Sequence, residues 1–273
     1  MNRFLTLVLL VLLLSACTPT SKNPSSPNQL DQAKQIADDL NKDVSLVTIV
    51  EQNHKKKAFI NEENVSFDIL LDFGGKTRMD GKITLSTDSR NGKIEQKDGN
   101  IILFNNGNVY CSRGMNGNSA RFAAYTWSYF FMFPYKLSDK GTNWKTYENG
   151  SLKGQTYDAQ KLTFDQGIGD APEDWYIMYS DKDTYLINTA AYIVTADQSL
   201  EEAEKDPHAI EYCDYKEVAG IPVATTWRFW GWQADKGLTN QLGNAQISNI
   251  KFHTVENGFY SSTSDRGTLV PVN

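Results

Sequence analysis

Three neighbouring carboxylates, Asp170, Glu173 and Asp174, could do chemistry together. Paired carboxylates act as acid and base in glycoside hydrolysis, and a set of three can also ligate Ca²⁺. A solvated acidic turn has the same appearance in a sequence and is the favoured interpretation. A hydrolase that uses this cluster therefore remains the least favoured of the functions considered below.

Other catalytic patterns in the chain are incomplete. Segment 117–121 comes nearest to a nucleophile elbow, but it lacks the closing glycine of that motif. Ser248 and Lys251 match Ser-x-x-Lys, yet residues three apart on a strand point to opposite faces. The three histidines are scattered, without cysteine or carboxylate at ligand spacing. We therefore expect a protein that is not an enzyme, with no cofactor and no metal site.

Cys17 follows a secretory signal. Residues 1–16 combine a short basic start, an apolar stretch of about a dozen residues and small residues before the cysteine, which is typical of a signal peptide. The tetrad 14–17, Leu-Ser-Ala-Cys, is similar to the bacterial lipobox, in which the cysteine thiol is acylated and becomes the first mature residue. The alternative is an ordinary signal peptide cleaved after Ala16, but Leu14 fits its A-x-A pattern poorly. We expect lipid attachment at Cys17.

Residues 17–28 are rich in Pro, Ser and Asn and carry no large apolar side chain, as in a flexible tether. Two or more acyl chains anchor a protein stably, so the membrane is the first expected partner. Thr18, rather than Asp, follows the cysteine, which favours the bacterial outer membrane. A periplasm-facing body is expected, and surface display stays open.

The charge balance excludes other partners. The chain has 27 Lys+Arg against 33 Asp+Glu, a net charge of −6, and loss of residues 1–16 removes Arg3 and leaves −7. The longest basic run is His-Lys-Lys-Lys at 54–57. Nucleic acid and anionic membrane surfaces are therefore poor candidate partners. No protein partner can be named.

Most of the chain shows the period-two pattern of strands. The strand-like runs are 65–73, 82–86, 101–104, 109–111, 143–148, 156–164, 174–179, 184–195, 208–218, 221–232 and 245–254. Turn dipeptides separate many of them: Gly74-Gly75, Asn91-Gly92, Asp98-Gly99, Asn106-Gly107 and Asn149-Gly150. Asp80-Gly81 is either another turn or a glycine inside a strand. The absence of βαβ alternation predicts a large antiparallel sheet and excludes doubly wound folds.

Two segments show helical features. Segment 30–40 has one apolar face and Asn28 as a plausible N-cap. Segment 119–133 is alanine- and aromatic-rich, with Ser119 to cap it and Pro134 to stop it, although aromatics also favour a strand. As a helix it is apolar nearly all round, so we expect a curved sheet to enclose it. One side carries Phe122, Tyr125, Tyr129 and Phe133, and the other carries Trp127, Phe130 and Phe131.

The sequence allows two interpretations of its cysteines and two of its clustered tryptophans. Cys111 and Cys213 either form a disulfide or stay reduced and packed, and the reduced form is favoured. Trp227, Trp230 and Trp232 either form a sugar-stacking platform or pack on both faces of a covered strand. Packing is favoured here.

Two stretches carry a family resemblance. Stretch 212–227 has an acidic-aromatic strand, a turn on Gly220 and Ile221-Pro222 opening the next strand, and stretch 174–186 has a strand, an acidic turn and a strand. With the predicted helices and meanders, they resemble the outer-membrane lipoprotein carrier and receptor (LolA/LolB-like) superfamily over about residues 30–255. The chain is also similar to uncharacterised acylated envelope proteins of Bacteroidota-like bacteria. The resemblance implies a half-open β-barrel that holds helices on its concave side and takes up acyl chains.

The chain departs from that family in two respects. The soluble carrier is not acylated, so the lipobox makes this chain more like the receptor, and the mature chain is longer than either. No lipoprotein-handling residue of the family can be matched onto it.

We therefore predict an α+β fold, a strongly curved antiparallel half-barrel sheet of about ten strands with helices on its concave face. Residues 1–16 form the signal peptide, 17–28 the acylated cysteine and tether, and 29–273 a single domain. The leading function is non-catalytic binding of a lipid or another apolar ligand. The alternative is a structural or interaction lipoprotein with a self-filled core. The predicted ligand-binding residues are Phe122, Tyr125, Trp127, Tyr129, Phe130, Phe133 and Trp230.

Overall fold

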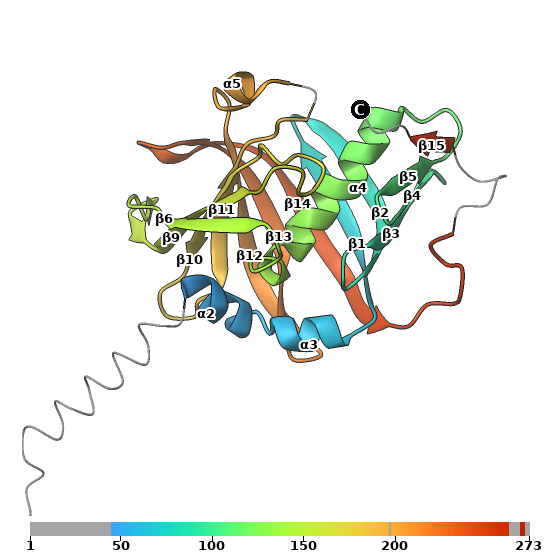
Figure 1. The fold of residues 1–273 in the computed structure, drawn as a ribbon, viewed down its shortest axis with the longest axis horizontal. Coiled ribbons are helices and arrows are strands. Elements are labelled where there is room, and N and C mark those ends of the chain that lie inside the picture. The colour runs from blue at the N-terminus through green and yellow to red at the C-terminus, as the bar shows by residue number, and fades with distance from the viewer. Residues whose placement is uncertain (1–44, 197, 262–267, 271–273) are drawn as a thin grey trace, which may run out of the picture. The chain divides into compact units, whose positions relative to one another are not determined.

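The computed structural model describes residues 45–196, 198–261 and 268–270 (Figure 1). The predicted signal peptide, the tether with Cys17 and the predicted helix at 30–40 lie outside the described residues. Within the described part, no helix has the length and apolar character that a membrane span requires.

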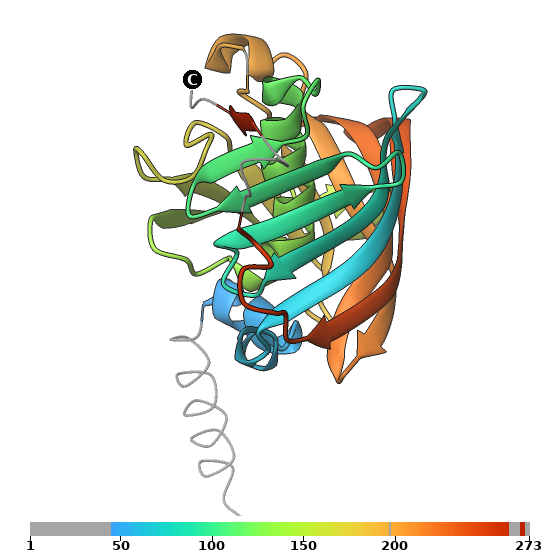
Figure 2. The same ribbon diagram turned by 90° about the vertical axis from the view of Figure 1, so that its right-hand side faces the viewer.

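One antiparallel sheet of thirteen strands dominates the body, in the order β15-β5-β4-β3-β2-β1-β14-β13-β12-β11-β10-β9-β6. It curves strongly and does not close, which leaves β15 and β6 as edges (Figure 2). The first half contains β1 (Asn64–Phe73), β2 (Lys76–Ser86), β3 (Asn91–Gln96), β4 (Ile101–Asn105) and β5 (Asn108–Cys111). The second half contains β6 (Thr142–Thr146), β9 (Asp158–Phe164), β10 (Tyr176–Ser180), β11 (Ile187–Tyr192), β12 (His208–Val218), β13 (Ile221–Gln233) and β14 (Gly237–His253), and β15 spans Thr268–Val270. The predicted antiparallel half-barrel is thus confirmed.

The turn dipeptides of the sequence predict most of the strand ends correctly, but two of these dipeptides do not form the turn themselves. Asn91-Gly92 opens β3 instead of turning, and the chain reverses at 87–90, with Ser89 in the left-handed region at φ 61°. Gly92 is needed for space, because a Cβ there would lie 2.2 Å from the Phe104 ring. Asn149-Gly150 also precedes a turn rather than forming it. The reversal falls at Lys153-Gly154, φ 48° and 78°, between β7 (Ser151–Leu152) and β8 (Gln155–Thr156).

Gly81 lies inside β2, which decides between the two interpretations of Asp80-Gly81. It pairs with Gln96 of β3, and a Cβ at this position would lie 2.3 Å from the carbonyl oxygen of Glu95. The glycine is therefore required by the close approach of two backbones.

The aromatic segment forms a helix, α4 (Gly117–Met132), as predicted, and not a strand. It begins two residues earlier than predicted because Asn116, and not Ser119, caps it: the Ser119 amide donates to Asn116 Oδ1 at 2.9 Å. Pro134 lies in the short 3₁₀ helix η1 (Phe133–Tyr135) that follows. Phe131 stacks on Phe67 of β1 with ring centroids 4.1 Å apart, so one side of α4 packs on the concave face (Figure 1).

The short helices α2 (Leu46–Asn53) and α3 (Lys56–Asn61) lie at one end of the sheet (Figure 1). Glu51 of α2 accepts from the amide and hydroxyl of Ser138, at 2.7 Å each. The amide of Ile187 donates to Nε2 of the buried His54 at 3.0 Å. These contacts tie α2 to the segment after α4 and to β11.

The convex face of the second half has its own hydrophobic cluster, which contains Trp175, Tyr179 and Trp232. The β7-β8 hairpin and α5 (Leu200–Ala203) contribute Leu152 and Ala203 to it. Trp227 of β13 lies in the main core, whereas Trp232 belongs to this second cluster and Trp230 packs against it. Strand β13 is therefore covered on both faces, as predicted for these tryptophans.

Cys111 and Cys213 are both free thiols, on β5 and β12. Burial raises the pKa of Cys213 to about 11, so its thiol stays protonated. The disulfide alternative is excluded in this structure.

Replacing Gly81 with alanine should destabilise the protein by about 1–3 kcal/mol, because the added Cβ must push β2 and β3 apart. Urea denaturation monitored by tryptophan fluorescence measures the loss. Lys82→Ala at the next, exposed position is the matched control and should change stability little. Equal losses in the two variants would contradict the close-approach argument.

Candidate functional site

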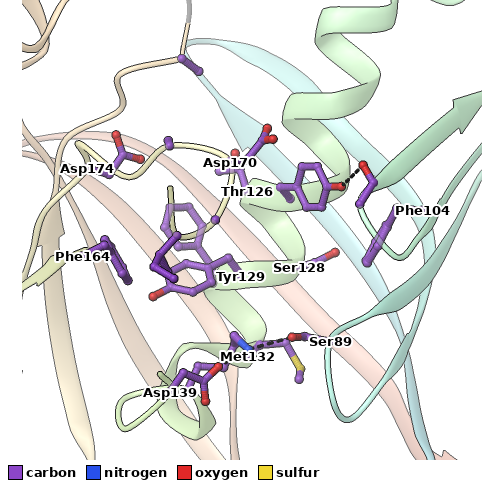
Figure 3. Close-up of a pocket in the computed structure, with 18 of the residues that line it drawn as sticks. Ser89, Phe104, Thr126, Ser128, Tyr129, Met132, Asp139, Phe164, Asp170 and Asp174 are labelled. Carbon is purple, nitrogen blue, oxygen red and sulfur yellow. Dashed lines mark hydrogen bonds and ion pairs between the residues drawn. The ribbon is translucent and has the colours of Figure 1, made fainter. Parts of the chain in front are cut away.

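A cavity of about 760 Å³ lies along the side of α4 that the sheet does not cover (Figure 3). The β9-β10 loop, residues 165–175, encloses it on one side, and Phe104 with the Asn106-Gly107 turn encloses it on the other. Figure 3 shows Thr126 and Tyr129 of α4 along the middle of this cavity, and Met132 beside Ser89 at one end. The cavity lies within the usual range for small-molecule sites.

Four of the seven predicted ligand-binding residues line the cavity: Phe122, Tyr125, Tyr129 and Phe130. The other three lie elsewhere. Trp127 is buried against Phe229 of β13, and Phe133, only 1% exposed, packs on Tyr129. Trp230 packs on the convex face under Lys153, whose Nζ lies 3.7 Å from the ring centroid. The helical side predicted to be one surface is therefore a cavity wall near its start and protein core at its end.

Strand residues that the sequence did not single out complete the wall: Phe104, Phe164, Tyr176 and Tyr192. Tyr176 and Tyr192 are direct partners in the β10-β11 register, with ring centroids 6.1 Å apart. Strand alternation puts them on one face once the pairing is known. The pairing itself could not be read from the chain.

The wall of the cavity is mostly aromatic, and it includes a polar atom that has no hydrogen-bond partner within the part of the chain that the structure describes. Tyr129 contacts Tyr176 with centroids 5.4 Å apart, and Phe130 contacts Tyr192 at 4.9 Å. Burial raises the pKa of all three tyrosines, so their hydroxyls are neutral. Ser128 Oγ is buried and has no hydrogen-bond partner among the described residues. Such a surface suits an apolar ligand with few polar groups.

Charged pairs stand at two ends of the cavity. Toward the start of α4, Arg121 Nε donates to Asp170 at 3.0–3.1 Å and Nη2 also binds this carboxylate. At the other end, where Figure 3 shows Asp139 and Ser89, Lys136 Nζ lies 2.5 Å from Asp139 and 2.7 Å from Ser89 Oγ. The cavity is therefore apolar in the middle and polar at its rims.

The acidic cluster of the sequence is divided between separate structural contacts. Asp170 pairs with Arg121, Glu173 is exposed, and Asp174 accepts from the amide and hydroxyl of Thr195 at 2.8 Å each. In the part of the chain that the structure describes, no three His, Cys, Asp or Glu side chains are grouped to hold a metal ion.

Comparisons with known proteins give fold relatives. No protein-family model matches the sequence, and no curated protein does. Among solved structures, a DUF1329 family protein from Desulfovibrio piger ATCC 29098 is similar with a TM-score of 0.50 and 12% identity, over 80% of this chain and 98% of that one. A LolA superfamily protein from Nitrosomonas europaea has a TM-score of 0.49 and 8% identity over 76% and 97% of the two chains. A domain assigned to outer-membrane lipoprotein sorting, from Vibrio parahaemolyticus, has a TM-score of 0.47 and 12% identity over 78% and 95%.

The solved structures with a similar fold thus include LolA-superfamily and DUF1329 proteins. At this identity the likeness concerns the fold alone.

Asp174 should make stability depend on pH. Burial raises its pKa to about 6, whereas an unfolded carboxyl titrates near 3.8. The native state therefore binds more protons between about pH 4 and pH 6, and the contribution of Asp174 to stability falls as the pH rises through that window. Asp174→Asn keeps an oxygen for Thr195 and cannot ionise. Its melting temperature should exceed that of the parent at about pH 7.5, and most of this difference should disappear at about pH 4.5.

Asp183→Asn, at an exposed turn, is the matched carboxyl-to-amide control for this pH series. A melting-temperature difference between Asp174→Asn and the parent that stays constant with pH would show that Asp174 does not titrate in this window.

Alanine substitutions at Phe133 and Phe122 should distinguish a core residue from a residue of the cavity wall by their effects on stability. Phe133→Ala removes a fully buried ring and should cost about 3–5 kcal/mol. Phe122→Ala shortens a half-buried ring that lines the cavity, so its cost should be much smaller. Urea denaturation measures both, and equal losses would contradict the assignment of Phe133 to the core.

Proposed function

We propose that this protein is a non-catalytic, lipid-anchored envelope protein that binds a lipid or another apolar ligand in the half-barrel. The observation that carries the proposal is the 760 Å³ cavity beside α4, with its aromatic wall. A half-open cavity of this size with a mostly apolar lining is characteristic of ligand sites.

The anchor belongs to the same proposal. Acylation of Cys17 places the body at the outer membrane, facing the periplasm, where lipids and lipoproteins are the available apolar ligands. The sequence 14–17 supports it. Cys17→Ser should move the protein from the detergent phase to the aqueous phase in a Triton X-114 partition, and an unchanged partition would refute the anchor.

The second candidate is a structural or interaction lipoprotein whose core is filled by its own side chains. The size of the cavity favours binding over this alternative, because the described side chains leave the space beside Thr126 and Tyr129 open (Figure 3). Native mass spectrometry of protein purified from its own envelope separates the two. Co-purifying lipid supports binding, and ligand-free protein supports the structural role.

Filling the cavity should abolish binding without unfolding the protein. Thr126 is half-buried on the cavity side of α4, so Thr126→Trp places a large ring in the space that a ligand would take. We expect roughly tenfold or greater loss of affinity for a neutral naphthylamine dye whose fluorescence rises in apolar surroundings. Asn118→Trp, at an exposed position in the first turn of the same helix, is the control. Unchanged dye affinity in Thr126→Trp would place the binding site elsewhere.

A further inference from the structure

We propose that the cavity selects amphiphiles with an anionic head group and that Arg121 binds that head. This inference rests on the proposed function, because it concerns which apolar ligand the cavity takes. The ligand class is a long alkyl chain that ends in an oxyanion, either a carboxylate or a phosphate.

Arg121 has an unused hydrogen-bonding edge. Its Nε and Nη2 are directed to Asp170, whereas Nη1 is buried and has no hydrogen-bond partner among the described residues. A guanidinium group carries five N–H donors in one plane, so an oxyanion that displaces Asp170, or that reaches the buried Nη1 as the side chain shifts, finds free donors on Arg121. The ring of Tyr125 lies 5.1 Å from the guanidinium carbon and supports it, and the Tyr125 hydroxyl donates to Gly107 O at 3.2 Å.

The other cations around the cavity lack this combination of burial and free donors. Arg121 has a side chain only 13% exposed, whereas that of Arg90 is 73% exposed and lies beside Asp88. Lys136 already contacts Asp139 and Ser89. A buried donor that bears charge and lacks a partner is costly, so an oxyanion from a ligand gains most at Arg121.

The neighbouring carboxylates determine how such a ligand binds. Asp170 opposes a second anion, but its side chain is 38% exposed and can turn toward solvent while the ligand holds Arg121. Asp174 is held by Thr195 on the same loop. Asp170 therefore competes with the ligand for Arg121, and removing its charge should strengthen binding.

The test compares three ligands of equal chain length, hexadecanoate, hexadecyl phosphate and hexadecanol, by isothermal titration calorimetry at about pH 8, with the two charged ligands below their critical micelle concentrations and the alcohol below its solubility limit. The parent should prefer one or both charged ligands over hexadecanol, and the stronger of the two identifies the head group. Arg121→Gln should weaken binding of the charged ligands roughly tenfold and leave hexadecanol unchanged. Asp170→Asn, which breaks the same ion pair but keeps the guanidinium, should bind the charged ligands as well as or better than the parent.

Lys140→Gln, at an exposed cation on the cavity rim, is the matched control and should match the parent. The proposal is overturned if Arg121→Gln affects the alcohol and the charged ligands equally, or if Lys140→Gln weakens the charged ligands as much as Arg121→Gln does. Equal weakening in Asp170→Asn and Arg121→Gln also overturns it, because the intact ion pair and not the cation would then matter. A parent that binds hexadecanol without preferring the charged ligands refutes only this inference, and a parent that binds none of the three refutes the proposed function.

Discussion

A sheet of thirteen strands has a concave face larger than one helix can cover, and this mismatch in size governs the rest of the structure. Helix α4 has 16 residues and is therefore about 24 Å long and about 10 Å wide. Its alanines, Ala120, Ala123 and Ala124, are buried against the sheet and let the helix approach it closely. The opposite side of the helix, with Tyr125 and Tyr129, meets the strands only through the rings of Phe104 and Tyr176, with centroids 5.5 and 5.4 Å apart. The cavity is the part of the concave face that the helix leaves uncovered.

The strands that form the cavity wall opposite α4 are also packed on their convex face. Alternate residues of β10 point to the two faces, so Tyr176 faces the cavity side while Tyr179 joins the convex cluster with Trp175 and Trp232. The β7-β8 hairpin covers that cluster through Leu152, which is 2% exposed. Packing on both faces holds the strands that carry the aromatic wall, and it limits how far the wall can collapse into the cavity.

The far end of α4 is held by polar contacts as well as by packing. Glu51 of α2 binds Ser138 and Lys56, and burial lowers the pKa of His54 to about 3, so that this histidine is neutral and its Nε2 can accept from the Ile187 amide. Tyr212 of β12 adds a hydrogen bond to the Phe130 carbonyl at 2.9 Å. The end of the helix is thus anchored to the sheet, whereas near its start the Arg121–Asp170 pair joins it to the β9-β10 loop. The polar groups of the cavity lie where the helix and the loops meet.

Much of the architecture was determined by the sequence alone, because its signals are local. Period-two alternation predicted strands that overlap most of those observed, and the spacing of alanines and aromatics predicted α4 to within two residues at its start. Gly81 and Gly92 were different, since their role is to let two chain segments approach, and only the paired strands show which atoms a side chain would strike. For the same reason, the sequence alone could not distinguish the aromatic residues of α4 that line the cavity from those that lie in the core. Phe122 and Phe133 lie on one side of the helix by spacing, but Phe122 borders the cavity, whereas Phe133 packs on Tyr129 and Tyr176 in the core. The pairing of Tyr176 with Tyr192 and of Arg121 with Asp170 joins residues far apart in the chain, and only the tertiary structure could decide these contacts.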